Sequence, residues 1–249
     1  MTTLALIGSG NIGSGVARLA VAAGHDVVLS NSRGPETLSD LVAELGPRAR
    51  AATAEEAARA GDVVVVTVPL KAVPSLPAQA LAGRLVLDTS NYYPQRDGNV
   101  AALDDRSTTP SAWVQQHLPG ARVVKVFNNI FYGHLPELAR PSGSPERSAL
   151  PVAGDDEAAL REATAFLDTL GYDTVVAGDL AESWRFEPGT PAYGAVYFDP
   201  DADASAAKPG QAAGMPPSSP PRPTTYAACS TPRATRAPSG AEPTRSARP

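Results

Sequence analysis

The sequence predicts an α/β protein built on a doubly wound parallel sheet, and three observations support this fold class. Short apolar runs alternate with segments of helical spacing over residues 1–128, which is the order that places helices on both faces of a parallel sheet. The run Val63–Val66 is apolar at every position, as in a central strand that is buried on both faces. A glycine-rich turn joins the first apolar run directly to the first helical segment.

The elements follow one another with short connections. Pro35 suits a first helical turn, and Gly24 and Gly61 suit helix ends. The expected strands are Leu4–Ile7, Asp26–Leu29, Asp62–Thr67, Arg84–Asp88 and Arg122–Phe127. The expected helices between them are Asn11–Ala23, Pro35–Leu45 and Ala54–Ala60. Right-handed crossovers are the default for such units.

A smaller α/β unit follows from about Ile130, after a loop rich in proline and glycine. Its expected elements are Ser148–Ala153, Asp155–Leu170 and Thr174–Ala177. Asp155 and Asp156 are well placed to cap the helix of this unit. The aromatic stretch Trp184–Pro200 is irregular, and we expect it to pack onto the body. We therefore predict a first domain over residues 1–129 and a small C-terminal domain over residues 130–200.

The end of the chain differs in composition from the rest. The chain has 249 residues and 25 prolines, and residues 201–249 hold ten of these prolines but no Val, Ile, Leu, Phe or Trp. Such a segment buries too little apolar surface to offset the entropy of its own ordering. It is therefore predicted to be a disordered Pro-rich tail. A frameshift in the gene after about Met215 would also produce this basic composition rich in Pro, Ser, Thr, Arg and Ala. Both explanations, a disordered tail and a frameshifted end, stay open.

Charge and cysteine content narrow the class of protein. The net charge is −5, and the tail carries six basic against three acidic residues, which leaves −8 on residues 1–200. An acidic body does not fit general nucleic-acid binding. No apolar run approaches the roughly 20 residues of a membrane span, and the start lacks the basic region of a signal peptide. The single cysteine, Cys229, has no partner for a disulfide. We expect a cytoplasmic protein without a membrane or nucleic-acid partner.

The strongest local signal is a glycine motif, which reads Gly8, Ser9, Gly10, Asn11, Ile12, Gly13. It follows an apolar strand and opens a helix, which is the context that a dinucleotide-binding fingerprint requires. In that fingerprint Gly8 allows a tight turn, Gly10 lets the backbone approach a pyrophosphate and Gly13 permits close packing of helix and strand. The helix N-terminus favours the anion. A structural turn in a fold without a ligand is the alternative explanation.

The end of the second strand indicates which dinucleotide binds. An NAD site usually has a carboxylate there, which bonds the ribose 2′-hydroxyl. This chain has Ser30, Asn31, Ser32 and Arg33 instead. Arg33 offers a charged fork for a 2′-phosphate, and the hydroxyls of Ser30 and Ser32 are supporting donors. The sequence therefore favours NADP(H), although a solvated arginine beside a polar turn is also common.

Other strand ends are expected to meet at the same crevice. They are followed by Val68, Pro69 and Leu70, by residues 88–94, and by residues 125–129. Such positions are well placed for contacts with nicotinamide and with a hydride acceptor. We single out Asn91 and Asn128, which are neutral donors next to apolar walls. Each of these residues also fits ordinary turn chemistry.

The sequence shows no metal-ligand cluster, no nucleophile elbow and no Ser/Lys pair. The three histidines lie in no motif with a base or a metal partner. We therefore predict neither a catalytic side chain nor a metal site. A reaction that needs no acid or base from the protein is preferred, and direct hydride transfer between two bound cofactors fits.

The chain resembles the NADP oxidoreductases that depend on coenzyme F420, an 8-hydroxy-5-deazaflavin. The resemblance covers most of residues 1–198 and is carried by Ile7–Gly13, Leu29–Leu38, Val66–Lys71, Asp88–Pro94, Val124–Asn129 and Ala149–Asp156. It implies a Rossmann domain, a small C-terminal domain and a grip on NADPH at Ser30–Arg33. It also implies a homodimer and hydride transfer between the nicotinamide C4 and the deazaflavin C5. The last 49 residues depart from the family.

Three functions remain open at this point. The first is hydride transfer between NADP(H) and F420. The second keeps NADPH but uses another small redox acceptor, such as a flavin, a quinone, an imine or a ferric complex. The third is a non-catalytic regulator that binds NADPH. The sequence has no Tyr-x-x-x-Lys pattern, which counts against ordinary ketone reduction.

Overall fold

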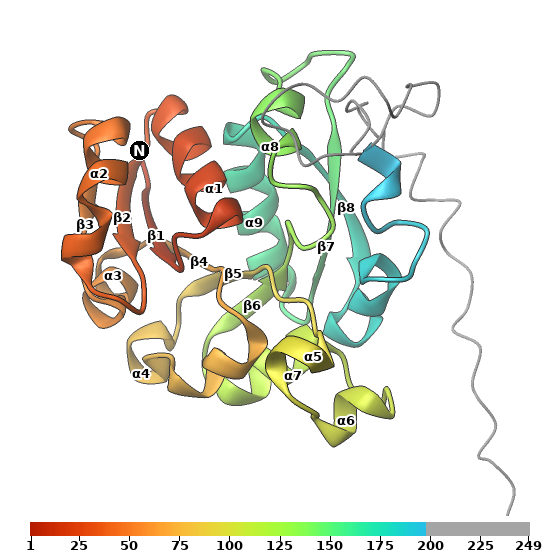
Figure 1. Ribbon diagram of the computed structural model, residues 1–249. Helices are drawn as coiled ribbons and strands as arrows, with labels where there is room; N and C mark the ends of the chain where they lie inside the picture. Colours follow the sequence, from red (N-terminus) through yellow and green to blue (C-terminus); the bar gives the residue numbers. More distant parts are fainter. Residues whose placement is uncertain (198–249) are drawn as a thin grey trace, which may run out of the picture.

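The computed structural model describes residues 1–197, which form an eight-stranded sheet with helices on both faces (Figure 1). The strand order is β3-β2-β1-β4-β5-β6-β7-β8. The strands are β1 Thr3–Ile7, β2 Asp26–Ser30, β3 Ala49–Ala51, β4 Val63–Val66, β5 Leu85–Asp88, β6 Arg122–Lys125, β7 Ala149–Gly154 and β8 Asp173–Gly178.

The helices connect these strands and differ widely in length. The α-helices are α1 Asn11–Ala22, α2 Ser39–Leu45, α3 Ala54–Ala60, α4 Ala78–Leu81, α5 Pro94–Asp97, α6 Ala101–Asp104, α7 Pro110–His117, α8 His134–Leu138 and α9 Glu157–Thr169. The 3-10 helices are η1 Pro35–Leu38, η2 Leu70–Ser75, η3 Leu180–Phe186 and η4 Ala195–Tyr197. In the described part of the chain, no helix has both the length and the apolar character that a membrane span needs.

The predicted fold class is confirmed, because the first six strands run parallel to one another. β4 is central, and all four of its valines are buried between β1 and β5. The chain builds outward from β1 through β2 to β3 and then returns to the other side of β1 as β4. In sheets of this kind a ligand crevice opens at such a reversal, beyond the carboxyl ends of the strands.

Alternating residues of β1 pack into two separate cores, one on each face of the sheet. On one face Leu4 and Leu6 pack with residues of α1 and α9. On the other face Ala5 and Ile7 pack with residues of α3, α4 and α7. This period of two follows from the pleat of a strand, and it explains why short runs without polar residues form the sheet.

The strands expected for the smaller C-terminal unit are β7 and β8, and they extend the same sheet. β7 runs antiparallel to β6, and β8 runs parallel to β7. As predicted, Asp156 caps α9 by accepting hydrogen bonds from the N–H groups of Ala158 and Ala159. The domain boundary near residue 129 stays a prediction. The predicted tail at 201–249, with Met215 and Cys229, lies outside the described residues.

Three local features differ from the sequence expectations. The segment Pro35–Leu45 is a 3-10 turn followed by a short α-helix, and the short edge strand β3 was not expected. β6 ends at Lys125 rather than at Phe127, because Phe127 has a backbone φ of 63°. A strand cannot continue through a residue in this left-handed region.

Residues 180–197, which we call segment 180–197, pack onto the body as expected, with Phe186 and Tyr197 buried. The Lys125 ammonium on β6 is fully buried and lies 2.7 Å from a carboxylate oxygen of Glu187. The Thr109 hydroxyl donates to the carbonyl of Leu180 at 2.7 Å. Segment 180–197 is thus attached to β6 and to the start of α7.

We expect Glu187→Ala to lower the free energy of unfolding by about 3 kcal/mol, because it leaves the buried Lys125 ammonium without its partner. Lys125→Met removes that ammonium, so the double variant should be more stable than the sum of the single changes predicts. Urea denaturation measures all three. Glu162→Ala is the matched control, because its pair with Arg122 is exposed and should contribute at most about 0.5 kcal/mol. Additive effects of the two changes would contradict the buried pair.

Candidate functional site

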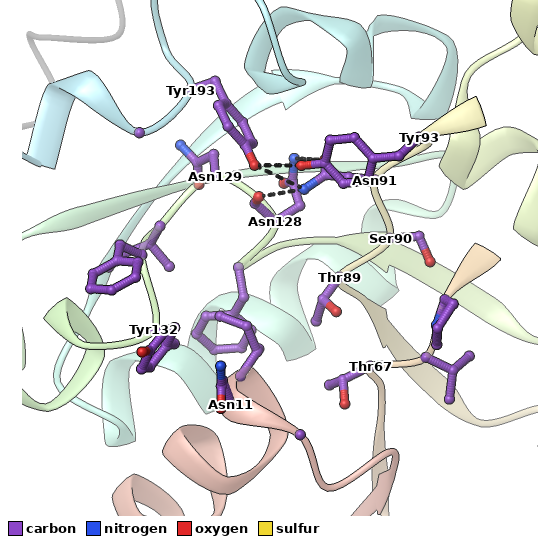
Figure 2. A pocket seen from close by; sticks show the side chains of 18 of the residues that line it. Asn11, Thr67, Thr89, Ser90, Asn91, Tyr93, Asn128, Asn129, Tyr132 and Tyr193 are labelled. Atoms are coloured by element: carbon purple, nitrogen blue, oxygen red, sulfur yellow. Dashed lines mark hydrogen bonds between the residues drawn. The ribbon is translucent and has the colours of Figure 1, made fainter. Parts of the chain in front are cut away.

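A cavity of about 770 Å³ opens beyond the carboxyl ends of β1, β4, β5 and β6 (Figure 2). It lies at the point where the strand order reverses, and one of its walls comes from segment 180–197. The residues that line it are Gly10, Asn11, Ile12, Thr67, Val68, Pro69, Thr89, Ser90, Asn91, Tyr93, Arg96, Phe127, Asn128, Asn129, Ile130, Phe131, Tyr132, Tyr193 and Gly194.

Two glycines of the motif, Gly8 and Gly13, have no room for a side chain, whereas the third, Gly10, borders free space. Gly8 has a φ of 108°, and a Cβ there would lie 2.5 Å from the carbonyl oxygen of Thr67. A Cβ on Gly13 would lie 2.2 Å from the carbonyl oxygen of Gly8. The Thr67 hydroxyl donates to that same carbonyl at 2.8 Å. Gly10 differs, because a Cβ there would meet no atom of the described residues within 4 Å.

The N-terminus of α1 at Gly10 is open to a ligand. Within residues 1–197 no side chain caps this end, and the first turn contains no acidic residue. The first N–H groups of a helix have no partner within the helix, and the helix dipole makes this end attractive to anions. The open space at Gly10 therefore fits a phosphate group that approaches the backbone closely.

The loop after β2 presents Arg33 to solvent. The Asn31 side chain shapes this loop, because its Oδ1 accepts from the Arg33 N–H and its Nδ2 donates to Thr37 Oγ1, both at 2.9 Å. The guanidinium of Arg33 is exposed and has no partner among residues 1–197. Ser32 is exposed beside it. This loop therefore has a backbone held by Asn31, and it offers a cation without a partner among the described residues at the strand end where a 2′-phosphate is expected.

Two serines of the expected site direct their hydroxyls at the backbone. Ser30 is fully buried, and its Oγ donates to the carbonyl of Leu6 at 2.9 Å. The Ser9 hydroxyl donates to the carbonyl of Ser30 at 2.9 Å. Their contribution is to hold β1, β2 and the glycine turn together. Ser32 is the serine of this loop that remains available as a donor.

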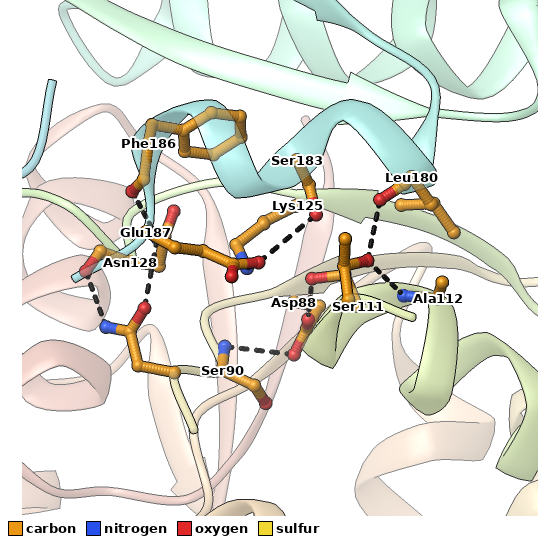
Figure 3. Close-up of polar contacts among 12 residues, drawn as sticks. Asp88, Ser90, Ser111, Ala112, Lys125, Asn128, Leu180, Ser183, Phe186 and Glu187 are labelled. Atoms are coloured by element: carbon orange, nitrogen blue, oxygen red, sulfur yellow. Dashed lines mark hydrogen bonds and ion pairs between the residues drawn. The ribbon is translucent and has the colours of Figure 1, made fainter. Parts of the chain in front are cut away.

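Asn91 and Asn128 line the cavity as expected, but they bond to one another rather than standing as independent donors. Asn91 Nδ2 donates to the Asn128 carbonyl at 2.8 Å. Asn128 Nδ2 donates to Asn91 Oδ1 at 3.1 Å and to the Phe186 carbonyl at 2.9 Å (Figure 3). Asn128 Oδ1 is buried and has no hydrogen-bond partner in the described part of the chain. The pair thus leaves an acceptor, which suits an N–H donor on a ligand.

The left-handed Phe127 turns the chain from β6 into the cavity wall. A bulky buried residue with a φ of 63° is an uncommon conformation that the surrounding structure must hold in place. It brings Asn128 and Asn129 to the cavity. Asn129 then anchors segment 180–197, because its Nδ2 donates to the Ala192 carbonyl at 2.8 Å and its own carbonyl accepts from the Gly194 N–H at 2.9 Å.

Tyr93 lies in the stretch 88–94 that was expected to face the crevice, but its contacts with Arg96 and Tyr193 at the far wall were not expected from the sequence. The hydroxyls of Tyr93 and Tyr193 lie 2.8 Å apart. The Arg96 guanidinium lies 4.9 Å from the centre of the Tyr93 ring, and it donates to the Asn91 carbonyl at 2.7 Å. Burial, together with the hydrogen bond to Tyr93, raises the pKa of Tyr193. The aromatic run at 92–93 was visible in the sequence, but its partner lies 100 residues further along the chain.

The remaining predicted residues divide into those at the cavity and those away from it. Gly10, Asn11, Ile12, Val68, Pro69, Asn91 and Asn128 line the cavity. Leu70 does not, because it is buried in the core. Gly8, Ser9, Gly13 and Ser30 shape the turn behind it, and the loop of Asn31, Ser32 and Arg33 lies beyond its lining.

The described residues that line the cavity include few ionisable side chains. Arg96 is the charged residue of its lining, and no His, Lys, Cys, Asp or Glu of the described chain lines it. Residues 1–197 also contain no group of three His, Cys, Asp or Glu side chains placed to hold a metal ion. Such a cavity binds and orients ligands through hydrogen bonds and apolar contact, and it holds no conventional proton-transfer group other than the tyrosines.

Comparison with known proteins places the chain among oxidoreductases. Residues 3–92 match the model of the family described as NADP oxidoreductase coenzyme F420-dependent. The protein YjhV of Escherichia coli (strain K12) is 45% identical over 53 residues, which are 21% of this chain and 39% of that protein. The chain therefore matches well under two thirds of the length of this curated relative.

Two solved structures share the fold over most of the chain. The hypothetical protein SMa0349 from Sinorhizobium meliloti is 30% identical with a TM-score of 0.67, over 78% of this chain and 93% of that chain. A candidate F420-dependent NADP reductase from Arthrobacter sp. FB24 is 23% identical with a TM-score of 0.62, over 74% and 87%. At that lower identity the second likeness concerns the fold alone.

We expect Gly10→Ala and Gly13→Ala to separate ligand binding from folding. A methyl group on Gly10 enters the open space, so NADPH should bind about tenfold more weakly, while the free energy of unfolding changes by at most about 1 kcal/mol. A methyl group on Gly13 meets the Gly8 carbonyl and should cost about 2 kcal/mol or more. Fluorescence titration and urea denaturation measure the two effects. Tight NADPH binding by a folded Gly10→Ala protein would argue against the phosphate position.

Proposed function

Because the chain belongs to the family described as NADP oxidoreductase coenzyme F420-dependent, we propose that it transfers a hydride between NADP(H) and the deazaflavin F420. One observation carries the proposal most strongly. The cavity begins at the uncapped N-terminus of α1 and ends at Asn128 and Tyr193, and none of the described residues that line it is a His, a Lys or a carboxylate. A cavity of this kind suits the direct meeting of two redox molecules.

The residues present fit an NADP molecule at three separate points. The open space at Gly10 and the free N–H groups of α1 suit the pyrophosphate. Arg33 suits the 2′-phosphate, because Asn31 Oδ1 accepts from its backbone N–H and its exposed guanidinium has no partner in the described chain. The unpaired Asn128 Oδ1 suits the N–H of the nicotinamide carboxamide.

The protein contributes position and polarity. When bound, the reduced nicotinamide supplies a hydride, and the acceptor takes up this hydride together with one proton from water. The apolar side chains of Ile12, Val68 and Phe127 exclude water from the part of the cavity where the nicotinamide ring and the acceptor ring come together. The carboxamide contact at Asn128 fixes which face of the nicotinamide ring points into the cavity. Rate then comes from the alignment of two planar rings.

Two other functions fit the same binding residues. A reductase of a flavin, a quinone, an imine or a ferric complex keeps the NADPH contacts and changes the acceptor. A non-catalytic regulator keeps the NADPH contacts and has no acceptor. The features at Gly10 and Arg33 do not separate these functions, so the acceptor must be varied directly.

The purified full chain should oxidise NADPH when oxidised F420 is added, and the visible absorbance of the deazaflavin should fall as it is reduced. We expect this turnover to exceed that on a flavin, a quinone, an imine and a ferric complex at equal concentrations. Turnover on one of those acceptors without turnover on F420 would replace the first function by the second. Binding of NADPH without turnover on any acceptor would favour the regulator.

We expect Arg33→Ala to weaken NADPH binding by about 10- to 100-fold, because a hydrogen bond to a charged group contributes about 1.5–3 kcal/mol. NADH lacks the 2′-phosphate, so its affinity should stay within about twofold. Isothermal titration measures both nucleotides. Arg161→Ala is the control, because this exposed arginine lies on α9 and pairs with Glu157. An equal loss for both nucleotides would show that Arg33 does not contact the 2′-phosphate.

A further inference from the structure

Two tyrosines from distant parts of the chain meet at the far wall of the cavity. Tyr93 follows β5, and Tyr193 belongs to segment 180–197. Figure 2 shows the two hydroxyls facing one another beside Asn91 and Asn128. The hydroxyl oxygens lie 2.8 Å apart. Asn91 Nδ2 also approaches the Tyr193 hydroxyl, at 3.5 Å. The hydrogen bonds among the described residues leave one hydroxyl proton of Tyr93 and Tyr193 without an acceptor.

A count of protons shows what remains. Two phenol hydroxyls carry two protons, and one proton lies between the two oxygens. If Tyr93 donates to Tyr193, the Tyr193 proton has no acceptor among the described residues. If Tyr193 donates to Tyr93, the Tyr93 proton is the one without an acceptor. In either arrangement one O–H group is left to point into the cavity.

The surroundings keep this O–H group in place and protonated. Asn129 anchors the residues on both sides of Tyr193, through the Ala192 carbonyl and the Gly194 N–H. Burial raises the pKa of Tyr193, so that the hydroxyl stays neutral well above physiological pH. A donor that is already oriented loses little entropy when it binds a ligand.

The nearest charge is positive. Arg96 lines the cavity beside Tyr93, and its partner Asp97 lies behind it with a side chain that is fully buried. Burial acts to raise the pKa of Asp97, but hydrogen bonds from Arg96 and from the Tyr93 N–H hold this pKa below its usual range. No carboxylate lines the cavity in the described part of the chain. The wall therefore favours an electron-rich ligand atom.

We propose that Tyr93 and Tyr193 form the acceptor-binding element, which donates a hydrogen bond to a carbonyl oxygen of a planar conjugated acceptor. This role rests on the proposed function. Hydride uptake adds negative charge to such an acceptor, and the charge collects on the conjugated carbonyl oxygen. A fixed donor aimed at that oxygen stabilises the transition state more than the ground state. Flavins, deazaflavins and quinones carry this carbonyl, whereas a ferric complex does not require it.

The test compares Tyr93→Phe, Tyr193→Phe and the double variant by steady-state kinetics. The acceptor is the one that the wild-type chain turns over best, with oxidised F420 and menadione tested first. Either single variant should lower kcat/KM for the acceptor by about tenfold, because the remaining hydroxyl still donates. The double variant should lose about 100-fold or more, as expected when an oxyanion donor is removed. The affinity for NADPH should stay within about twofold.

Tyr92→Phe is the matched control. Tyr92 is the neighbour of Tyr93, but its hydroxyl bonds to Gly98 and Asp104, and it does not line the cavity. We expect this variant to keep its acceptor kcat/KM within about twofold. An equal loss in Tyr92→Phe, or weaker NADPH binding in the double variant, would assign the effect to the loop and overturn the role.

The outcomes separate this role from the proposed function. Turnover on menadione but not on F420 removes the proposed acceptor, and the tyrosine variants are then tested with menadione. Unchanged kcat/KM in the double variant overturns the tyrosine role and leaves the proposed function standing. Absence of turnover on every acceptor overturns both, because the pair then has no acceptor to bind.

Discussion

The close approach between Gly8 and Thr67 is the constraint on which the rest of the site depends. The Thr67 hydroxyl donates to the Gly8 carbonyl, and no room for a side chain is left at Gly8 or Gly13. This contact joins the ends of β1 and β4 at the reversal of strand order, and it fixes the point at which α1 begins. The direction of the free N–H groups of α1 follows from it, and so does the position of the cavity. A dinucleotide site is thus a consequence of backbone packing.

The residues that follow β6 form the cavity wall opposite the glycine turn, and a different structural feature places them there. The left-handed Phe127 stops the strand and directs Asn128 and Asn129 inward. Asn128 bonds to the β5 loop at Asn91 and to segment 180–197 at Phe186, while Asn129 bonds to Ala192 and Gly194. Two consecutive amides therefore connect three segments. This explains why the side-chain donors of Asn128 face the protein, while its buried Oδ1 has no hydrogen-bond partner among the described residues.

The sequence predicted the features that are local in the chain and missed those that depend on distant contacts. The roles of Gly8 and Gly13 follow from six consecutive residues, and Val63–Val66 follows from its composition. Ser30 was expected to offer its hydroxyl to a ligand, yet the alternation of β2 turns that side chain into the interior. Pairing of β7 with β6 and of Tyr193 with Tyr93 joins residues far apart in sequence. No periodicity within a short window reports such pairs.

The chain is acidic overall, but the charged side chains Arg33 and Arg96, which lie where the ligands are proposed to bind, are positive. The net charge is −5, but the β2 loop presents the exposed Arg33 and the far wall presents Arg96, and the N-terminus of α1 adds the positive end of a helix dipole. Arg33 has no partner among the described residues, whereas Arg96 is paired with Asp97. The free cation suits the full charge of a phosphate, and the compensated one suits the partial charge that develops on a carbonyl oxygen.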